Sequence, residues 1–195
     1  MNINALFLIN AVGFGIGLAM DAFSVSMANG LAEPKMKKNR MSLIAGVFAG
    51  FQIGMPLIGW ICIHTIAAMF ESFQKFIPWI ALILLGYIGG KMLIEGIRNA
   101  DGGEEPPAVS FKELIVQGIA TSIDALSVGF TIAEYNFAEA LLEALIIGVV
   151  TFFICIGGLM IGKKFGTKLA NKASILGGII LLAIGLEIFI SGIIG

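Results

Sequence analysis

Charged residues interrupt the apolar sequence at intervals that leave six long hydrophobic segments. Each segment holds at most one Asp, Glu, Lys or Arg over about 20 residues or more, the length that an α-helix needs to cross a bilayer. The segments are Ala5–Leu31, Met41–Phe70, Phe76–Ile94, Leu114–Ala133, Ala144–Gly162 and Ala173–Gly195. This pattern predicts an all-α integral membrane protein with six transmembrane helices joined by short connections.

The lysine and arginine residues predict how these helices are oriented. All but Lys75 of the 12 basic residues fall in connections that would lie on one side of the membrane. They are Lys35, Lys37, Lys38 and Arg40 after the first helix, Lys91, Arg98 and Lys112 around the third connection, and Lys163, Lys164, Lys168 and Lys172 in the fifth. Because basic loops stay in the cytoplasm, we expect both termini to lie outside it.

The two halves of the chain are similar at an offset of 103 residues. Residues 20–26 (MDAFSVS) align with residues 123–129 (IDALSVG), and two Ile-Gly pairs near the end of the second helix align with two in the fifth. Each half contains three predicted helices, an odd number, so the second half would enter the membrane from the opposite side. We expect inverted-topology repeats at 1–98 and 111–195, joined by a linker at 99–110, an architecture typical of secondary transporters.

Composition narrows the class of protein further. The chain is 58% hydrophobic and 13% charged, whereas about 25% of residues are charged in soluble domains, which excludes an ordinary water-soluble enzyme. A net charge of -1 gives no basis for a nucleic-acid partner. Cys62 and Cys155 both lie in apolar sequence, so neither a disulfide framework nor a zinc motif is predicted. The first residues lack a signal-peptide pattern, and we expect the first apolar segment to be retained.

Glycine occupies 26 of the 195 positions, and two groups of glycines recur every four residues. Such spacing places them on one face of a helix, where the missing side chain allows a second helix to approach closely. The groups are Gly46, Gly50 and Gly54 in the second segment and Gly158, Gly162 and Gly166 at the end of the fifth. We expect both groups to be helix-packing surfaces.

Two aspartates stand near the middle of apolar segments and are equivalent in the two repeats. A carboxylate at the bilayer centre costs roughly 2.5–3.5 kcal/mol, so Asp21 and Asp124 need a compensating partner. Two carboxylates at one depth would neutralise a divalent cation, and Mg²⁺ and Mn²⁺ favour oxygen ligands. Neither motif contains His or Cys, which argues against zinc or copper. The alternative is that each aspartate bonds a neighbouring helix and serves packing alone.

Several polar residues could complete a cation site around the two aspartates. Hydroxyls flank both acids, although each could instead bond a backbone carbonyl of its own helix. Gln52 and Glu187 lie in apolar segments and could either line the site or bond elsewhere. Carbonyls freed by helix breaks near Gly17 or Gly118 would add oxygen atoms. The candidate metal ligands are Asp21, Asp124, Ser24, Ser26, Ser122, Ser127, Gln52 and Glu187.

Four motifs together resemble the bacterial manganese efflux pump (MntP) family, which is distantly similar to the lysine exporter superfamily. They are Met20–Ser26, Ile119–Ala125, Pro56–Trp60 and Gly89–Gly96. The resemblance covers nearly the whole chain and implies a manganese(II) exporter of the bacterial plasma membrane, with no catalytic activity and no cofactor. It implies that Asp21 and Asp124 form the core of the metal path, with Ser26 and Ser122 at the family's small polar positions.

The direction of transport requires an energy source. Exporting a divalent cation against an inside-negative potential costs about 4.6 kcal/mol per 100 mV, since each charge costs roughly 2.3. The chain has no P-loop, so exchange for protons at Asp21 and Asp124 is the simplest hypothesis. The open alternatives are an exporter of an amino acid or other small solute, a structural membrane subunit, and an intramembrane aspartyl protease, although no GxGD motif is present.

Overall fold

The computed structural model describes residues 5–65, 77–98, 108–169 and 173–194, and within these ranges every regular element is an α-helix. The helices are α1 (Ala5–Ala32), α2 (Lys38–Thr65), α4 (Ile77–Arg98), α5 (Phe111–Ala120), α6 (Ile123–Thr131), α7 (Phe137–Leu169) and α8 (Ala173–Ile194). The all-α prediction is therefore confirmed for the described residues. Among them, Phe7–Ala32, Lys38–Ile63 and Phe137–Gly166 are long and apolar enough to cross a membrane, and α8 contains a shorter apolar stretch.

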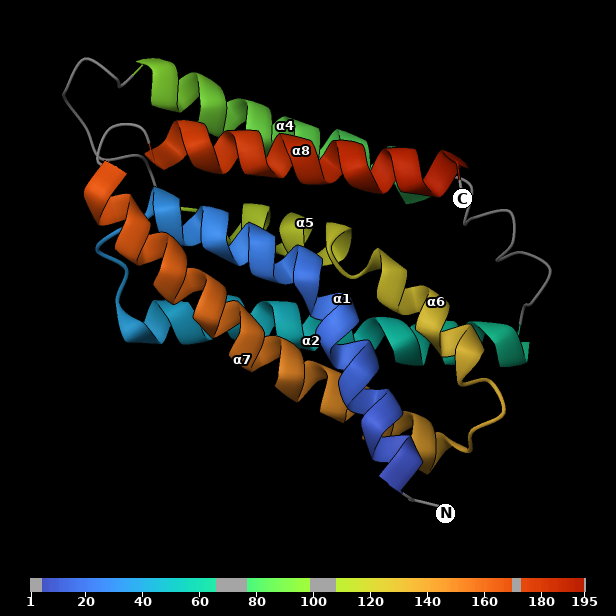
Figure 1. Ribbon diagram of the computed structural model, residues 1–195. Helices are drawn as coiled ribbons and strands as arrows, with labels where there is room; N and C mark the ends of the chain where they lie inside the picture. The colour runs from blue at the N-terminus through green and yellow to red at the C-terminus, as the bar shows by residue number, and fades with distance from the viewer. Residues whose placement is uncertain (1–4, 66–76, 99–107, 170–172, 195) are drawn as a thin grey trace.

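The fourth apolar segment is not one helix, as the sequence analysis predicted, but two. Helix α5 ends at Ala120, a turn follows at Thr121 and Ser122, and α6 begins at Ile123. The break lies three residues beyond Gly118, close to one of the two predicted positions. The predicted break near Gly17 is wrong, because α1 remains helical from Ala5 to Ala32, although its ribbon changes direction part way along (Figure 1).

The helices form two groups that lie against each other. Helices α4 and α8 lie side by side, and α8 also contacts α1 (Figure 1). The other group is built on α7, which contacts both α1 and α2, while α2 also packs against α6. Residues buried at the contact of the groups include Ile88 of α4, Leu181 of α8 and Ala22 of α1, which belong to one apolar cluster.

Several helix contacts can be compared with the predicted repeat. Exchanging α1 with α5–α6, α2 with α7, and α4 with α8 converts the α1–α7 contact into the contact of α2 with α5 and α6. The same exchange converts the α1–α8 contact into the α4–α5 contact and leaves the α2–α7 and α4–α8 contacts unchanged. These contacts agree with the exchange, and the inverted repeat itself stays a prediction.

The two glycine groups behave differently. A Cβ atom at Gly158, Gly162 or Gly166 would collide with carbonyl oxygens of α1, so the fifth-segment group is a close-packing surface as predicted. A Cβ atom at Gly46, Gly50 or Gly54 would meet nothing within 4 Å. The prediction for the second-segment group is therefore wrong, because equal spacing places these glycines on a face of α2 that contacts no other described helix.

Candidate functional site

The two predicted aspartates lie in the central part of the helix bundle and interact with each other. Asp21 is half-buried on α1, and Asp124 is solvent-accessible in the first turn of α6. The charge of Asp21 acts on the Asp124 carboxyl group. The two motifs therefore lie within electrostatic range of each other, although they are about one hundred residues apart in sequence. Like charges in this range repel, and either a shared cation or bound protons relieves the repulsion.

The helix break explains how Asp124 is positioned. The first N–H groups of a helix lack intrahelical acceptors and carry partial positive charge, so they favour an anion. Because α6 starts at Ile123, Asp124 stands at this end, and its Oδ1 accepts a hydrogen bond of 2.9 Å from the Ala125 N–H. The break thus supplies a polar environment for one carboxylate inside an apolar segment.

Gln52 joins the two aspartate motifs. It is completely buried, and its Nε2 donates hydrogen bonds of 3.1 Å to both the Leu18 and the Thr121 carbonyl oxygens. Leu18 and Thr121 are equivalent at the repeat offset, and each lies three residues before its aspartate. Gln52 Oε1 is buried with no hydrogen-bond partner among the described residues. One amide therefore contacts both repeats symmetrically and leaves a neutral oxygen available beside the acids.

Pro56 adds to the polarity of this region. It lies within α2, four residues after Gln52, and proline has no N–H group. The Gln52 carbonyl therefore lacks its α-helical donor. The α-helical hydrogen bonding of α2 is thus interrupted at Gln52, the residue whose side chain contacts α1 and the α5–α6 break.

The flanking hydroxyls fall into two groups. Ser24 Oγ donates to the Met20 carbonyl at 3.0 Å and Ser122 Oγ to the Gly118 carbonyl at 2.7 Å, the local bonding considered as the alternative. Ser26 is completely buried beside the Cys155 thiol, but its Oγ forms no hydrogen bond of normal geometry among the described residues. Ser127 is exposed on α6.

The carbonyls released at the break are largely occupied. Thr121 Oγ1 donates to the Gln117 carbonyl at 2.9 Å, the Ser122 N–H donates to the Ile119 carbonyl at 3.2 Å, and Gln52 occupies the Thr121 carbonyl. The expectation that this break provides free carbonyl ligands receives no support from these bonds. Apart from Glu143, the buried side chains whose oxygens have no hydrogen-bond partner among the described residues are Gln52, Ser26 and Thr151.

Glu187 lies on α8, and its side chain is outside the described residues. Among the side chains that are described, no group of three or more His, Cys, Asp or Glu residues is arranged to hold a metal ion. A cation at the aspartates would therefore be bound by two carboxylates together with neutral oxygens, a ligand set suited to a hard divalent ion.

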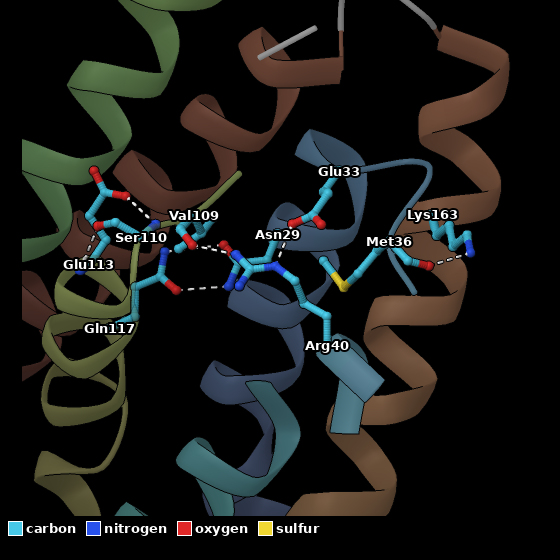
Figure 2. Close-up of polar contacts among 9 residues, drawn as sticks. All are labelled: Asn29, Glu33, Met36, Arg40, Val109, Ser110, Glu113, Gln117 and Lys163. Carbon is cyan, nitrogen blue, oxygen red and sulfur yellow. Dashed lines mark hydrogen bonds and ion pairs between the residues drawn. The ribbon is translucent and has the colours of Figure 1, made fainter. Parts of the chain in front are cut away.

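A set of polar contacts lies at one end of the bundle. Figure 2 shows Asn29, Arg40 and Gln117 close together, with Lys163 of α7 set apart against the Met36 carbonyl. Asn29 and Gln117 are completely buried and exchange two hydrogen bonds, of 2.7 and 3.2 Å. Arg40 donates to Glu33 at 2.9 Å and to the Val109 carbonyl, and Lys163 donates to the Met36 carbonyl at 2.6 Å. We call Asn29, Glu33, Arg40, Gln117 and Lys163 the polar clamp.

A second ion pair lies near the polar clamp. Lys91 Nζ of α4 contacts Glu113 Oε1 of α5 at 2.5 Å, and Glu113 also forms a capping box with Ser110 at the start of α5. Partial burial acts to raise the pKa of Glu113, but the hydrogen bonds from Lys91 and Ser110 outweigh it and leave that pKa below its ordinary value. The bonds therefore stabilise the ionised form.

We expect Glu113→Gln to destabilise the protein in a pH-dependent way. A group with a lowered folded-state pKa contributes stability above its unfolded pKa, near 4.5, and loses it as the pH falls through the folded-state value. The variant should be less stable by about 1 kcal/mol at pH 7, and the difference should vanish in acid. Thermal unfolding of both proteins in detergent, at a series of pH values from about 3 to about 8, tests this. A difference that is constant with pH would contradict it.

Aromatic side chains close the opposite end of the bundle. Tyr135 follows α6, and its ring lies 5.7 Å from that of Phe7 in α1, measured between centroids. The indole N–H of Trp60 in α2 donates to the Tyr135 carbonyl at 3.0 Å, and the Trp60 ring lies 6.0 Å from Phe137 of α7. We call Phe7, Trp60, Tyr135 and Phe137 the aromatic cap. The two ends of the bundle thus differ in chemistry.

Sequence reasoning missed four buried polar residues, Asn29, Gln117, Glu143 and Thr151. Asn29 and Gln117 pair across 88 residues, and no local pattern signals such a contact. Glu143 lies one residue before the predicted fifth segment, yet α7 begins at Phe137 and Glu143 is 1% exposed. The sequence signal was the capping box of Asn136 and Glu139, which marks the start of α7.

Comparison with known proteins identifies the family. The family model described as "Putative manganese efflux pump" matches residues 35–189. A relative from Clostridium botulinum strain Hall, named "Putative manganese efflux pump MntP 2", is 42% identical, and the match covers 94% of each chain. An MntP from Methanosphaera stadtmanae is 40% identical over 94% of this chain and 99% of its own, and one from Clostridium perfringens strain SM101 is 40% identical over 90% and 91%. No solved structure matches the chain. This membrane protein therefore belongs to the manganese efflux pump (MntP) family.

Proposed function

We propose that this protein is a secondary transporter that exports manganese(II) from the bacterial cytoplasm in exchange for protons. The relatives are named as manganese efflux pumps, which supports manganese as cargo and export as direction. The oxygen-rich surroundings of Asp21 and Asp124 suit a hard divalent cation rather than a thiophilic one. The protein is a transporter without enzymatic activity or a cofactor in this proposal, and manganese is its substrate.

The proposed metal ligands are the two carboxylates together with Gln52 Oε1 and Ser26 Oγ. Gln52 Oε1 is buried without a partner among the described residues, a state that costs roughly 1–3 kcal/mol and that a cation would relieve. Ser26 Oγ is buried beside the Cys155 thiol and forms no hydrogen bond of normal geometry among these residues. Ser24, Ser122 and Ser127 remain as secondary candidates, since a hydroxyl that donates to a carbonyl keeps lone pairs for a metal. Glu187 is proposed as an acid of the path without a defined geometry.

Charge balance explains how protons and manganese can compete for one site. Two ionised aspartates within electrostatic range neutralise one Mn²⁺, and two protons neutralise the same pair after the metal leaves. Binding of the metal therefore displaces protons, and protonation favours its release. Because export against the membrane potential costs about 4.6 kcal/mol per 100 mV, an inward proton flux is the proposed energy source.

We propose six transmembrane helices in two inverted repeats, with both termini outside the cytoplasm and the polar clamp on the cytoplasmic side. The symmetric pattern of helix contacts supports the repeats. The gathering of Arg40, Lys91 and Lys163 at one end of the bundle supports the orientation, because basic residues concentrate at cytoplasmic ends. In this arrangement the aromatic cap faces outward, and alternate opening of the two ends would expose the aspartates to each side.

The observation that carries the proposal is the symmetric bridge of Gln52 between the two aspartate motifs. An amide that contacts both repeats beside both acids, with its own oxygen unoccupied, is difficult to explain by packing alone. In an inverted-repeat transporter the substrate binds where the repeats meet. In this proposal the aspartates and Gln52 occupy that position.

The decisive test is transport of radiolabelled manganese in proteoliposomes that contain the purified protein and an imposed pH gradient. We expect manganese to move toward the acidic compartment and proton movement in the opposite direction, both absent from protein-free liposomes. Excess iron(II) should slow the flux, whereas equimolar magnesium should hardly affect it, because magnesium is reluctant to lose water. Manganese movement that ignores the pH gradient would contradict proton exchange, and no movement would contradict manganese transport.

A further inference from the structure

Glu143 is the buried acid that the proposed site does not use. It lies on α7, is 1% exposed, and neither carboxylate oxygen has a hydrogen-bond partner among the described residues. Desolvating an unpaired carboxylate is among the most expensive events in a protein interior. A glutamate persists at such a position only if it is neutral there or if it acquires a partner in another state.

The surroundings of Glu143 are apolar. Ala140 and Ile147, one turn before and one turn after it on the same face of α7, belong to a buried cluster. The cluster also contains Leu18 of α1, Ala125 and Val128 of α6, and Ile132 just after α6, so these segments cover the face of α7 that carries Glu143. The side chains of this cluster provide no donor for the carboxylate.

Two titratable groups near Glu143 come from the segment that begins α7. Tyr135 is in the aromatic cap, and partial burial together with the charges of Glu143 and Glu139 raises the pKa of its phenol. Glu139 lies one turn earlier on α7 and forms the capping box with Asn136. The cluster residues of α1 and α6, and the α2 residues Met55, Leu57 and Trp60 that pack against them, have no titratable side chain. Glu143 therefore faces acids and apolar groups.

Glu143 lies away from Asp21 along the bundle. A Cβ atom at Gly15 of α1 would lie 3.3 Å from the Cα of Ile147, which fixes the register of α1 against α7. The glycine contacts further along show that the two helices run in the same direction. Since Asp21 follows Gly15 and Glu143 precedes Ile147, the two carboxyls are about 15 Å apart along the helix axes. Glu143 thus lies on the side of the aromatic cap.

We propose that Glu143 is a third protonation site of the transport cycle, which takes up a proton when the aromatic-cap end closes and releases it when that end opens. The ligand is a proton rather than a metal ion, because a divalent cation needs several oxygen ligands and Glu143 belongs to no acidic cluster among the described side chains. A proton requires one carboxylate oxygen. Closure buries the acid in its neutral form, and water that enters on opening solvates the ionised form.

This role couples the outward gate to proton concentration and rests on the proposed exchange function. An acidic exterior would favour the protonated, closed arrangement, so the empty carrier would close outside after manganese leaves. Removal of the carboxyl should therefore separate two activities. Exchange of manganese for manganese needs only the metal site and the movement of the metal-loaded protein, whereas accumulation driven by a pH gradient also needs the proton-dependent return.

The test compares Glu143→Gln, which keeps the shape and removes the proton site, with Glu143→Asp, which retains a carboxyl, and with Glu139→Gln as the matched control one turn earlier. In proteoliposomes, Glu143→Gln should retain manganese–manganese exchange within about twofold and lose at least about tenfold of pH-driven accumulation, a change of roughly 1.4 kcal/mol. Glu143→Asp should restore part of the accumulation, and Glu139→Gln should behave as wild type. Equal loss of both activities in folded Glu143→Gln would overturn the proposal.

A second measurement does not depend on transport. The infrared spectrum of the purified wild-type protein in lipid nanodiscs at neutral pH should contain the carbonyl band of a protonated carboxylic acid. The difference spectrum against Glu143→Gln should contain this band, and that against Glu139→Gln should not. Its absence would overturn the proposal even if manganese exchange is confirmed. If the wild type transports no manganese, the proposed function fails, while the band still decides whether Glu143 holds a proton.

Discussion

Asp21→Asn and Asp124→Asn should each reduce proton-coupled manganese flux by roughly 100-fold while the protein remains folded, a loss of about 2.7 kcal/mol. Asparagine preserves the shape of the side chain but removes one of the two charges that neutralise the cation. The remaining carboxylate and the neutral oxygens of Gln52 and Ser26 would face a net positive charge in a medium of low dielectric constant. The measurement is radiolabelled manganese uptake into proteoliposomes under a pH gradient.

The control for the aspartate variants is Glu134→Gln, which removes an exposed carboxyl from the connection between α6 and α7. Its flux should equal that of the wild type, since a solvated surface charge contributes little to a site inside the bundle. Normal transport by either aspartate variant would make that residue structural and would leave the paired-carboxylate mechanism without a basis. Loss of folded protein would be detected by size-exclusion chromatography before reconstitution.

The positions of the helices and of the two acids could be predicted from sequence because both depend on a single strong rule. Long apolar segments require helices in a membrane, and a charge within such a segment is conspicuous. The pairing of Asp21 with Asp124 followed from the repeat, and their electrostatic contact in the structure agrees with that pairing. The family followed from motifs that are specific in combination, and the relatives confirm it.

The local geometry of the site was less predictable, because it depends on contacts between distant segments. No spacing rule indicates that Gln52 bonds the carbonyls of Leu18 and Thr121, which lie 34 and 69 residues away. The break between α5 and α6 does not show in the charge pattern, since residues 114–133 contain a single charged residue, Asp124. The hydroxyls of Thr121 and Ser122 make the break possible by satisfying backbone carbonyls that would otherwise lack donors.

Glu143 shows where a rule based on charge alone fails. The predicted fifth segment was started after this acid, because a charged residue is usually taken as the end of a membrane helix. The capping box at Asn136 and Glu139 instead starts α7 at Phe137, about two turns earlier. Capping signals do not depend on hydropathy. They place the start of α7 before Glu143, whereas a hydropathy window assigns Glu143 to a connection.

Three glycine-to-alanine variants, one in each glycine group and one at Gly129 of α6, test the helix packing in this structure. We expect Gly162→Ala and Gly129→Ala to destabilise the folded protein by about 3 kcal/mol or more, whereas Gly50→Ala should be neutral or slightly stabilising. At Gly129 a Cβ atom would lie 2.5 Å from the Pro56 carbonyl oxygen and from the Trp60 nitrogen, and at Gly162 it would overlap the Met27 carbonyl. These neighbours are backbone atoms of α2 and α1, so the helices must separate to accept one methyl group, and the aspartates they position would separate with them.

Gly50 supplies the matched comparison because it is also a helix glycine within an apolar segment, yet a Cβ atom there meets nothing within 4 Å. The gain in helix propensity from glycine to alanine, about 1 kcal/mol, then acts without a steric cost. Thermal unfolding followed by size-exclusion chromatography in detergent measures all three variants on one scale. If Gly50→Ala is as damaging as Gly162→Ala, the outer face of α2 contacts another protein chain in the assembled transporter, and the contrast between the two groups does not hold there.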